Sequence, residues 1–505
     1  MAMQHGKCTN YALCTKADTQ ETQNIPEGAD FVCQECKRPL TAVGRSQAGP
    51  PPSQQRSLLS ILALLALLAL GGYYFLHRTS HRNPDGREPV TTVTPSGPAT
   101  LLLRLSGSNT IGSQLGPDLA QAWLASRGAS DIHRATSGSD ETTITGTQSG
   151  TAVNVEVKAH GSATAFADLG ANASDIGMAS RKIKSQEASD LQSKGLGDLT
   201  SNADERVVGL DGVAVIVNEA NGADSMTKEE VANIFSGGST KQTWNVYARD
   251  DKSGTYDTFK DRVLGSRSLT PGAKRFEDSR ALATAVAQDR NGIGFVGLPY
   301  AVGVKVVAIA ERGATPLIPN TMTVRTEAYP LSRRLYLYVP DNAKTEARDF
   351  VRFALSPAGQ DIVEKDGFIG QKVDVVKEQA PANAPAGYLA LMPSADRLSV
   401  DFRFRTGSSD LDTKAVDDIK RVAASMGSQF SGRGVMLVGF ADSTGNPAAN
   451  LRLSKDRAQA VAGQMSRQGV TPVSITGFGQ ELPVADNATP DGREKNRRVE
   501  VWLRK

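Results

Sequence analysis

The fold is decided by the stretch RDDKSGTYDTF, residues 249–259, which follows a short strand-like run and opens a helix. Ser253 and Thr255 offer hydroxyl groups there, Gly254 lets the backbone approach a ligand closely, and the first N–H groups of the helix lack partners within it. Arg249 can add a two-pronged bond to an oxyanion. The stretch therefore predicts an anion-binding turn, although a Ser-Gly-Thr run before a helix is also a good N-cap.

The same order of strand, small polar turn and helix occurs again in the chain. Residues 106–110 (SGSNT) follow a predicted strand at 101–105, and residues 160–166 (HGSATAF) follow another at 153–159. A further predicted strand, residues 175–181, ends on a polar pair. Such a series at the C-terminal ends of strands is expected where an open α/β sheet binds a ligand at its topological switch point. Helix capping explains each turn singly but does not explain the series.

Further segments complete the predicted α/β pattern. The apolar run at 210–219 (LDGVAVIVNE) is typical of a buried parallel strand, residues 227–235 (TKEEVANIF) of a capped helix, and residues 278–290 of another helix. Residues 291–297 (NGIGFVG) contain the spacing G-x-G-x-x-G. A dinucleotide site is not expected there, because a helix precedes the run, the run itself has the pattern of a strand, and Leu298-Pro299 follows where a helix should begin.

Length and charge bound the class of protein. A chain of 505 residues is too long for one hydrophobic core, so we expect several folding units. The 57 Lys and Arg residues nearly balance the 54 Asp and Glu residues, which leaves a net charge of +3 and does not favour a nucleic-acid partner. The 5 histidines show no Ser/His/Asp or Cys/His set that would indicate nucleophilic catalysis, so no enzymatic activity is expected.

Residues 57–76 (SLLSILALLALLALGGYYFL) carry no charged side chain and, at about 1.5 Å per residue, are long enough to cross a bilayer as a helix. The segment starts too far into the chain for a signal peptide and ends in aromatic residues typical of a membrane interface. Positive charges are slightly more frequent before it than after it, and every cysteine precedes it. We therefore expect one transmembrane helix in the bacterial inner membrane, with a cytoplasmic N-terminus and periplasmic main domains.

The cysteines, Cys8, Cys14, Cys33 and Cys36, lie in a segment that spans residues 1–43. The second pair has the C-x2-C spacing of a zinc knuckle, and so short a segment needs a cross-link to fold. We expect these thiolates to hold a structural zinc ion, with two disulfides or a redox pair as the alternatives. The segment resembles the small zinc ribbons of bacterial membrane proteins, which implies a structural or docking role.

Linkers rich in Pro, Gly, Ser or Ala separate the predicted units at residues 44–56, 77–100 and 376–395. After the last linker, residues 396–505 alternate strand patterns with two amphipathic helical patterns. Two helices packed on one sheet form an α+β sandwich, which is the fold expected for this last unit.

Residues 101–375 resemble the phosphate-binding periplasmic receptors of ABC transporters, which have the type II periplasmic-binding-protein fold. The matching motifs occur in the order of that family: the turns at 106–110, 161–162, 175–181 and 251–255, then the runs at 292–300 (GIGFVGLPY), 329–333 (YPLSR) and 356–360 (SPAGQ). The resemblance implies a two-lobed α/β clamp that holds an anion between its lobes, with chain crossovers at a hinge. It also implies an ABC permease as a possible partner.

The anion ligands of that family, carried over by motif, fall on Asn109, Thr110, Ser162, Ser180, Arg181, Arg249, Ser253, Gly254 and Thr255. Neutral donors and helix N-termini suit a desolvated oxyanion, because each full charge is costly to bury. In the best-known receptors of this family an Asp stands where this chain has Arg181, and it accepts the proton of hydrogen phosphate. Arg181 cannot accept a proton, so that route of selection against sulfate is not implied here. The alternative is that Arg181 faces solvent or pairs with a carboxylate of the other lobe.

Residues 396–505 resemble the OmpA-like peptidoglycan-binding domain over nearly their whole length. The matching runs are 438–445 (VGFADSTG), 450–458 (NLRLSKDRA), 477–479 (GFG) and 496–500 (NRRVE). In that family an Asp and an Arg hold the diaminopimelate of the wall peptide, and the resemblance places them at Asp442 and Arg457, with Asn450 and Arg497 as supports. Opposite charges suit an amino acid that presents both an ammonium and a carboxylate group. The alternative is an internal salt bridge between Asp442 and Arg457.

Together these features predict a multidomain protein: a zinc-ribbon-like segment, one transmembrane helix, a two-lobed α/β periplasmic-binding clamp and an α+β OmpA-like sandwich. We expect an inner-membrane-anchored binding protein that captures phosphate or a similar oxyanion and is tethered to peptidoglycan. A tether at both ends is unusual for a receptor that must visit a permease. The alternative is therefore a structural or signalling envelope protein, in which the clamp is a scaffold and the ribbon docks a cytosolic partner.

Overall fold

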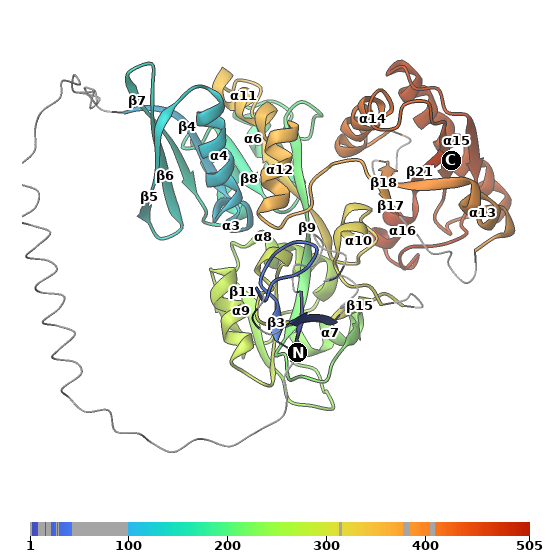
Figure 1. Ribbon diagram of the computed structural model, residues 1–505, viewed down its shortest axis with the longest axis horizontal. Helices are drawn as coiled ribbons and strands as arrows, with labels where there is room; N and C mark the ends of the chain where they lie inside the picture. The colour runs from blue at the N-terminus through green and yellow to red at the C-terminus, as the bar shows by residue number, and fades with distance from the viewer. Residues whose placement is uncertain are drawn as a thin grey trace, which may run out of the picture.

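The computed structural model describes residues 3–8, 16, 22–26, 28, 30–42, 99–312, 316–376, 384–404 and 410–505. The predicted transmembrane segment, residues 57–76, lies outside the described residues, as do Cys14, the linker 44–56 and almost all of the linker 77–100. In the part of the chain that is described, no helix is both long and apolar enough to cross a membrane. The described parts form a small N-terminal sheet, a two-lobed clamp and a C-terminal domain (Figure 1).

The N-terminal unit is a small antiparallel sheet. Its strands are β1 (Met3–Lys7), β2 (Thr22–Pro26) and β3 (Thr41–Ala42), with β1 in the centre. Its buried core consists of Cys8, Ile25, Cys33 and Leu40. One exposed hydrogen bond, 3.5 Å from Arg38 Nη2 to the carbonyl of Lys365, reaches the clamp. A bond of this length adds little, so it does not fix the unit to the clamp.

The first lobe of the clamp is built from two chain segments. The earlier segment supplies β4 (Thr100–Gly107), α3 (Asn109–Gly112), α4 (Leu115–Ser126), β5 (Ser130–Gly138), β6 (Glu141–Gln148), β7 (Thr151–Lys158), α5 (Ser162–Gly170), β8 (Ile176–Ala179) and α6 (Ser185–Ser193). The later segment adds β16 (Ser332–Tyr338), α11 (Thr345–Ala354) and α12 (Pro357–Lys365). Strand β4 pairs in parallel with β7 and β8, so the turns that follow these strands lie at one edge of the sheet.

The second lobe is formed by the chain between these segments. Its elements are β9 (Glu205–Val217), β10 (Ser225–Thr227), α7 (Lys228–Phe235), β11 (Asn245–Arg249), α8 (Gly254–Phe259), the π-helical turn η1 (Lys260–Leu264), β12 (Lys274–Phe276), α9 (Ser279–Ala287), β13 (Gly292–Gly297), the 3-10 turn η2 (Leu298–Tyr300), β14 (Lys305–Val306), β15 (Ala308–Ala310) and α10 (Thr321–Arg325). The predicted cap of α7 is confirmed, because the Thr227 side chain accepts the N–H of Glu230. The glycine-rich run at 291–297 contains strand β13, as expected.

One sheet crosses both lobes. Among the described residues it has 11 strands, in the order β12-β11-β13-β9-β16-β8-β4-β7-β6-β5, with β14 paired to β9 beside this path. Strands β9 and β16, called here the crossover strands, run between the lobes. Strand β9 pairs with β16 along most of its length and with β13 towards its end, and β16 leads from Leu331, buried in the second lobe, to Leu335, buried in the first. The sequence predicts a parallel strand at 210–219, and this is wrong, because β9 is antiparallel to both neighbours. A strand covered on both faces is apolar whatever its direction, so hydrophobicity cannot show the orientation.

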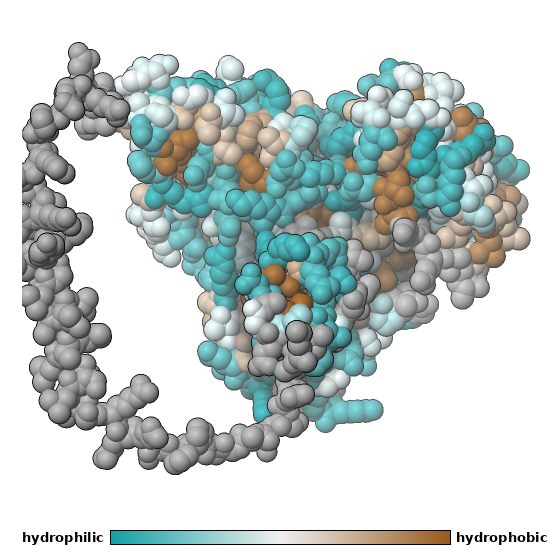
Figure 2. All heavy atoms as spheres, viewed as in Figure 1, coloured by the Kyte–Doolittle hydropathy of each residue, from teal (hydrophilic) through white to brown (hydrophobic). Residues whose placement is uncertain are grey.

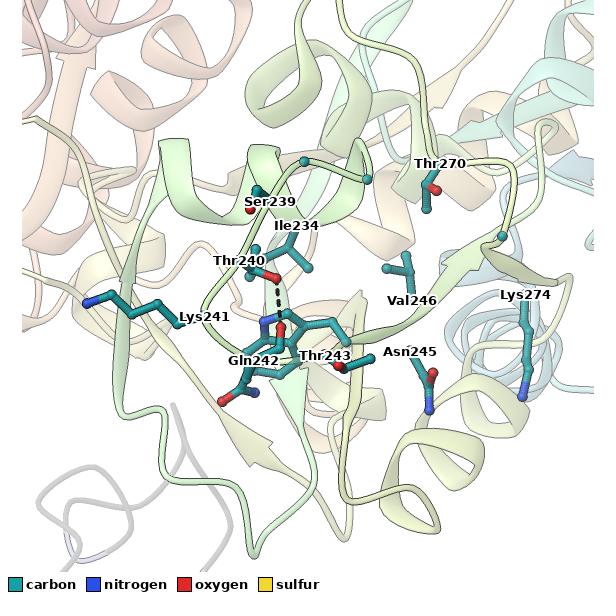
Figure 3. A pocket seen from close by; sticks show the side chains of 14 residues that line it. Ile234, Ser239, Thr240, Lys241, Gln242, Thr243, Asn245, Val246, Thr270 and Lys274 are labelled. Carbon is teal, nitrogen blue, oxygen red and sulfur yellow. Dashed lines mark hydrogen bonds between the residues drawn. The ribbon is translucent and has the colours of Figure 1, made fainter.

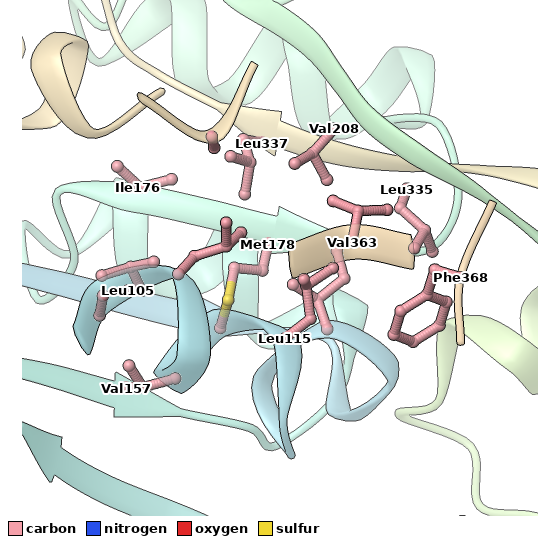
Figure 4. Packing of buried hydrophobic residues seen from close by; sticks show 14 of the residues in the cluster. Leu105, Leu115, Val157, Ile176, Met178, Val208, Leu335, Leu337, Val363 and Phe368 are labelled. Carbon is pink, nitrogen blue, oxygen red and sulfur yellow. The ribbon is translucent and has the colours of Figure 1, made fainter. Parts of the chain in front are cut away.

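Each lobe has its own hydrophobic core. Figure 4 shows the first, in which Leu115 of α4 and Val363 of α12 lie over Met178 of the sheet. In the second, Phe259 of α8 stacks on Phe295 of β13 with ring centroids 3.9 Å apart. This stack anchors α8 and so fixes the turn at which that helix begins. The visible face of the described units is largely hydrophilic, with apolar residues in small separate groups (Figure 2).

The C-terminal domain consists of helices packed on a 5-stranded sheet. Across the sheet, the strands run β17 (Val375–Val376), β18 (Ala395–Arg403), β21 (Arg498–Arg504), β19 (Val435–Gly439) and β20 (Ser474–Gly477). The helices are α13 (Ala386–Leu391), α14 (Thr413–Met426), α15 (Pro447–Arg467) and α16 (Pro490–Asn496), with the 3-10 turn η3 (Met392–Ser394) after α13. This arrangement confirms the predicted α+β sandwich.

Part of the predicted linker 376–395 belongs to the C-terminal domain. Helix α13 places Tyr388 in a buried cluster with Phe440, Phe478 and Trp502. Tyr388 is 1% exposed, and its hydroxyl donates to Glu500 at 3.0 Å. The segment has the composition of a linker, but one buried aromatic side chain is enough to anchor it to the domain. An average composition does not reveal the effect of one side chain.

Replacing Tyr388 with Ala is expected to destabilise the C-terminal domain by about 3–5 kcal/mol, because a buried aromatic ring is lost. The matched control is Leu389→Ala, at a neighbour that is 44% exposed, and it should cost less than about 1 kcal/mol. The unfolding free energy of each variant is measured from hydrogen exchange of the β21 amides at increasing concentrations of denaturant. A Tyr388→Ala substitution that also costs less than about 1 kcal/mol would show that this segment is a linker.

Candidate functional site

Polar turns of the clamp meet where the two lobes face each other. The first-lobe turns follow β4, β7 and β8, and the second-lobe turn follows β11. Their side chains are almost completely enclosed, with at most 7% exposure for Asn109, Thr110, Ser162, Ser180, Arg181, Arg249, Ser253 and Thr255. The structure thus brings together, in one buried place, turns that lie far apart in the sequence.

Hydroxyl groups from both lobes lie within hydrogen-bonding distance of one another. Thr110 Oγ1 is 3.2 Å from Thr255 Oγ1 across the cleft, and Ser162 Oγ is 3.3 Å from Ser180 Oγ in the first lobe. Ser162 Oγ also accepts the N–H of Ser180 at 2.9 Å. Because a hydroxyl both donates and accepts, this group, called here the hydroxyl cluster (Thr110, Ser162, Ser180 and Thr255), can turn its donors towards an anion.

The centre of the hydroxyl cluster is Arg333, which sequence reasoning did not place among the site residues. Its Nη1 donates to Thr255 Oγ1 at 2.8 Å and to Ser180 Oγ at 3.3 Å, and its Nη2 donates to Thr110 Oγ1 at 3.2 Å. Asp211 holds the guanidinium from behind, through bonds to Oδ2 of 3.0 Å from Nε and 2.6 Å from Nη2. Arg333 therefore joins hydroxyls of both lobes to the crossover strands.

The sequence carries two signals for this pair. Asp211 is a carboxylate near the start of a mainly apolar run, and a buried charge is rarely left without a partner. Arg333 closes the YPLSR run at 329–333. The pairing itself could not be predicted, since 122 positions separate the two residues. They face each other only because β9 and β16 pair in the register that aligns Asp211 with Arg333.

Arg249 is a second buried cation near Arg333. Its Nε donates to the carbonyl of Phe276 at 3.2 Å, and its Nη atoms donate to the carbonyl of Glu277 and to Ser279 Oγ. Burial lowers the pKa of Arg249 to about 10, and the charge of Arg333 acts in the same direction. A buried guanidinium that bonds to carbonyl and hydroxyl oxygens would be stabilised by an anion nearby.

Arg181 is held by carboxylates of both lobes. Its Nη1 and Nη2 bond to Glu187 of the first lobe at 2.8 and 2.6 Å, and its Nε bonds to Asp257 of the second at 2.7 Å. Burial alone would lower the pKa of Arg181, but Glu187 and Asp257 raise it above the ordinary value. Of the roles that the sequence leaves open, the structure therefore shows a pair with a carboxylate of the other lobe.

Two other predicted ligands make local bonds. Ser253 Oγ caps α8 by accepting the N–H groups of Thr255 at 3.2 Å and Tyr256 at 3.4 Å. Asn109 Nδ2 donates to the carbonyl of Ala159. The structure therefore shows the capping role of Ser253. Its hydroxyl hydrogen can still be donated to a ligand, because a hydroxyl that accepts also donates.

The lobes are closed on each other. Arg280 Nη2 of the second lobe donates to Gln114 Oε1 of the first at 2.8 Å. At Gly254 a Cβ would stand 2.2 Å from Ser162 Oγ, and at Gly161 a Cβ would stand 2.2 Å from the carbonyl oxygen of Lys252, so the lobes approach through glycines. An anion can reach the hydroxyl cluster only if the lobes part.

The second group of predicted residues lies in the C-terminal domain. Asp442 follows β19, accepts the N–H of Thr444 at 2.8 Å and pairs with Arg497 Nη1 at 3.1 Å. Burial would raise the pKa of Asp442, but the bonds from Thr444 and Arg497 outweigh it and hold the pKa below its ordinary value. Asn450 Nδ2 donates to Gln480 Oε1 at 3.0 Å.

Arg457, on α15, has unused hydrogen-bonding capacity. It is 9% exposed, and within the described ranges its Nε and Nη1 have no hydrogen-bond partner. Burial lowers the pKa of Arg457, Arg497 adds to this effect, and Asp442 opposes it. The carboxylate of Asp442 pairs with Arg497 rather than with Arg457. Buried donors that lack a partner beside a carboxylate suit a ligand that carries both charges.

Cysteine sulfurs gather in the N-terminal unit. The Sγ atoms of Cys8, Cys33 and Cys36 all lie within 4.8 Å of one another, and those of Cys8 and Cys36 are 3.5 Å apart. Zinc–sulfur bonds of about 2.3 Å in a tetrahedron place neighbouring sulfurs about 3.8 Å apart, which fits this arrangement. Gln23 Nε2 donates to Cys33 Sγ at 3.3 Å and orients that sulfur. Cys14, the fourth predicted ligand, lies outside the described residues.

A cavity of about 510 Å³ lies elsewhere on the second lobe (Figure 3). It is lined by the loop at 237–244 together with Asn245, Val246 and Lys274. In Figure 3 the Thr240 hydroxyl donates to the carbonyl of Gln242 at 2.7 Å. The cavity adjoins the N-terminal end of β11, whereas the turn at Ser253 follows the C-terminal end, so the cavity is separate from the hydroxyl cluster.

Comparison with known proteins gives matches for both large parts of the chain. Residues 134–358 match the PBP superfamily domain, and residues 403–497 match the OmpA family. Protein SphX of Synechococcus elongatus is 31% identical over 238 residues, which are 43% of this chain and 69% of that protein. The phosphate-binding protein PstS of Pseudomonas aeruginosa is 32% identical over 244 residues, 43% of this chain and 74% of that protein. A solved ABC-type phosphate transport receptor from Vibrio cholerae is 22% identical, with a TM-score of 0.40 and coverage of 53% of this chain and 99% of that chain.

Proposed function

The chain belongs to the family of these phosphate-binding proteins, with its PBP superfamily domain joined to an OmpA family domain, and on this premise we propose that its clamp binds phosphate or a similar oxyanion. The observation that carries the proposal is the meeting of Thr110, Ser180 and Thr255 around Arg333. Donors from both lobes and from a crossover strand converge there, as a clamp that closes on an anion requires. The proposal assigns binding and no reaction.

The hydroxyl cluster has a defined task in this proposal. Its hydroxyls bond to one another and to Arg333. An oxyanion that enters between the open lobes replaces these bonds with charge-assisted ones, which are stronger. Arg333 supplies positive charge behind the hydroxyls while Asp211 keeps its guanidinium in place, and Arg249 adds a second buried positive charge.

We place the two large domains in the periplasm, with residues 57–76 as the single membrane span and the cysteine-containing segment in the cytoplasm. The absence of charge over this span and the position of every cysteine before it support that topology. The linker 77–100 can extend by at most about 3.5 Å per residue, so the clamp stays near the membrane.

A structural or signalling role is the second candidate. The C-terminal domain contacts the clamp through the ion pair of Asp412 with Arg334, at 2.8 Å. This contact fixes the domain to the clamp. Such a fixed assembly suits a sensor that reports to a cytosolic partner of the N-terminal segment. A partner whose binding depends on the anion would favour signalling, whereas capture by an ABC permease would favour transport.

Calorimetry on the full-length protein in detergent is expected to show binding of phosphate at one site. Thr255→Val should weaken it by roughly 10–100-fold, because a hydrogen bond to a charged group contributes about 1.5–3 kcal/mol. Thr284→Val, at an exposed position of α9, is the matched control and should bind like the parent protein. A parent protein that binds none of phosphate, sulfate, arsenate and molybdate would rule out the proposal.

We further propose that the C-terminal domain holds peptidoglycan through Asp442 and Arg457, with Asn450 and Arg497 as supports. The partnerless donors of Arg457 beside a carboxylate support this. Asp442 would take the ammonium group of diaminopimelate and Arg457 its carboxylate. This assigns the domain the role of a wall anchor.

Arg457→Leu is expected to abolish co-sedimentation of the full-length protein with purified peptidoglycan, because the ligand carboxylate loses the arginine proposed to bind it. Binding by the parent protein should persist from pH 7 to about pH 5, since a depressed pKa keeps Asp442 ionised until the pH falls below the ordinary carboxyl range. Arg433→Gln, which removes an ion pair with Asp396 in the same domain, is the control. Unchanged sedimentation of the Arg457 variant would refute this assignment.

We also propose that Cys8, Cys33 and Cys36 hold a structural zinc ion with Cys14 as the fourth ligand, which would cross-link the small N-terminal unit.

Elemental analysis of the full-length protein should find about one zinc per chain, and Cys33→Ser should reduce the zinc content strongly, because four thiolates complete the tetrahedral site. Metal-free protein whose thiols react with an alkylating reagent only after reduction would show that disulfides form instead.

A further inference from the structure

The C-terminal domain contacts the first lobe of the clamp through helix α14. Thr413 Oγ1 donates to Glu205 Oε1 at 2.9 Å, and Asp417 pairs with Arg206 at 2.8 Å. Glu205 and Arg206 open strand β9, where it pairs with the part of β16 that lies beside β8. These contacts therefore tie the domain to the sheet of the first lobe.

The same domain contacts the second lobe through different residues. Arg403 Nη2 donates to the carbonyl of Thr326 at 2.7 Å. Lys495 Nζ donates to the carbonyls of Tyr329 at 3.1 Å and Pro330 at 2.9 Å. Tyr329 belongs to the hydrophobic core of the second lobe, and Arg403 and Lys495 are almost completely buried. One folded domain thus contacts the clamp on both sides of the hinge.

A buried ion network lies between these two sets of contacts. Glu327 pairs with Arg334 at 2.6 Å and with Arg403 at 2.8 Å, and Arg334 pairs with Asp412 at 2.8 Å. Burial would raise the pKa of Glu327, but the two arginines hold it well below its ordinary value, so the carboxylate stays charged. Separating the network would leave a buried charge without its partner, which resists movement of the domain away from the hinge.

This network adjoins the hydroxyl cluster along β16. Neighbouring residues of a strand point to opposite faces of a sheet. Arg333 bonds to Thr255 of the cluster, while Arg334 bonds to Asp412 of the C-terminal domain. The crossover strand that positions the anion site is therefore the strand on which the C-terminal domain docks.

We propose that the C-terminal domain is a brace across the hinge, which holds the two lobes in their closed arrangement. When the lobes part, Glu205 and Arg206 move relative to residues 326–330, and one rigid domain cannot follow both. Opening therefore breaks one set of contacts. The coupling of this step to anion entry rests on the proposed binding function, whereas the brace itself does not.

Hydrogen exchange on the full-length protein without phosphate tests the brace. The double variant Thr413→Val with Asp417→Ala removes the two contacts of α14 with Glu205 and Arg206 and changes no residue of the clamp. We expect amide exchange to become roughly tenfold faster at residues 162–166 and 254–259, which face each other across the cleft, because these amides are protected by closure. Asp396→Ala, which removes a carboxylate paired with Arg433 within the C-terminal domain, is the matched control and should leave this exchange unchanged.

Exchange at residues 326–331 reports whether the domain has left its docking surface. Faster exchange there with unchanged exchange in the cleft would show that the domain docks without bracing, and would overturn the proposal. Lys495→Met, which removes the bonds to the carbonyls of Tyr329 and Pro330 on the second lobe, should also speed cleft exchange and guards against a folding defect in α14. Added phosphate should restore protection in the variants that exchange faster. Exchange in these variants that phosphate leaves unchanged would reject the binding function and leave the brace standing.

Discussion

The ion pair between Arg333 and Asp211 is the interaction on which the clamp depends. It is almost completely buried and joins the two strands that cross between the lobes. A buried pair is stable only when the remaining donors are also satisfied, and here the hydroxyls of Thr110, Ser180 and Thr255 accept them. Closure of the lobes therefore completes the bonding of Arg333. Opening would remove Thr255 from it and leave a guanidinium donor for the anion that we propose binds there.

Four buried arginines of the clamp have different partners. Arg333 faces the hydroxyl cluster, Arg181 joins the lobes through Glu187 and Asp257, and Arg334 joins the clamp to the C-terminal domain. Only Arg249 bonds chiefly to neutral oxygens, so among these four it is the one whose charge most needs an anion. Lobe closure, domain docking and the proposed anion binding therefore involve one hinge region, through which the proposed wall anchor would influence the proposed anion site.

Local patterns predicted the polar turns because such turns depend on residues close in sequence, such as Ser253, Gly254 and Thr255 before α8. Relations between distant residues escaped prediction. The direction of β9 could not be obtained from its apolar run, and the partner of Asp211 depends on strand register. Likewise, the sequence did not decide whether Arg181 binds an oxyanion ligand or a carboxylate side chain, because both offer oxygen acceptors to a guanidinium. The anchoring of Tyr388 in an Ala- and Pro-rich segment was hidden for a similar reason, since its aromatic partners lie far along the chain.

The sequence by itself determined the order of the units and the chemistry offered at each turn, because composition, periodicity and small motifs act over a few residues. It determined that hydroxyls, glycines and arginines would stand at strand ends, and that Asp442 and Arg457 would stand in one domain. Only the tertiary structure decided which of these groups meet. The antiparallel register of β9 and β16 set Arg333 in the cleft and Arg334 against the C-terminal domain, and that register results from the packing of both lobes around the crossover strands.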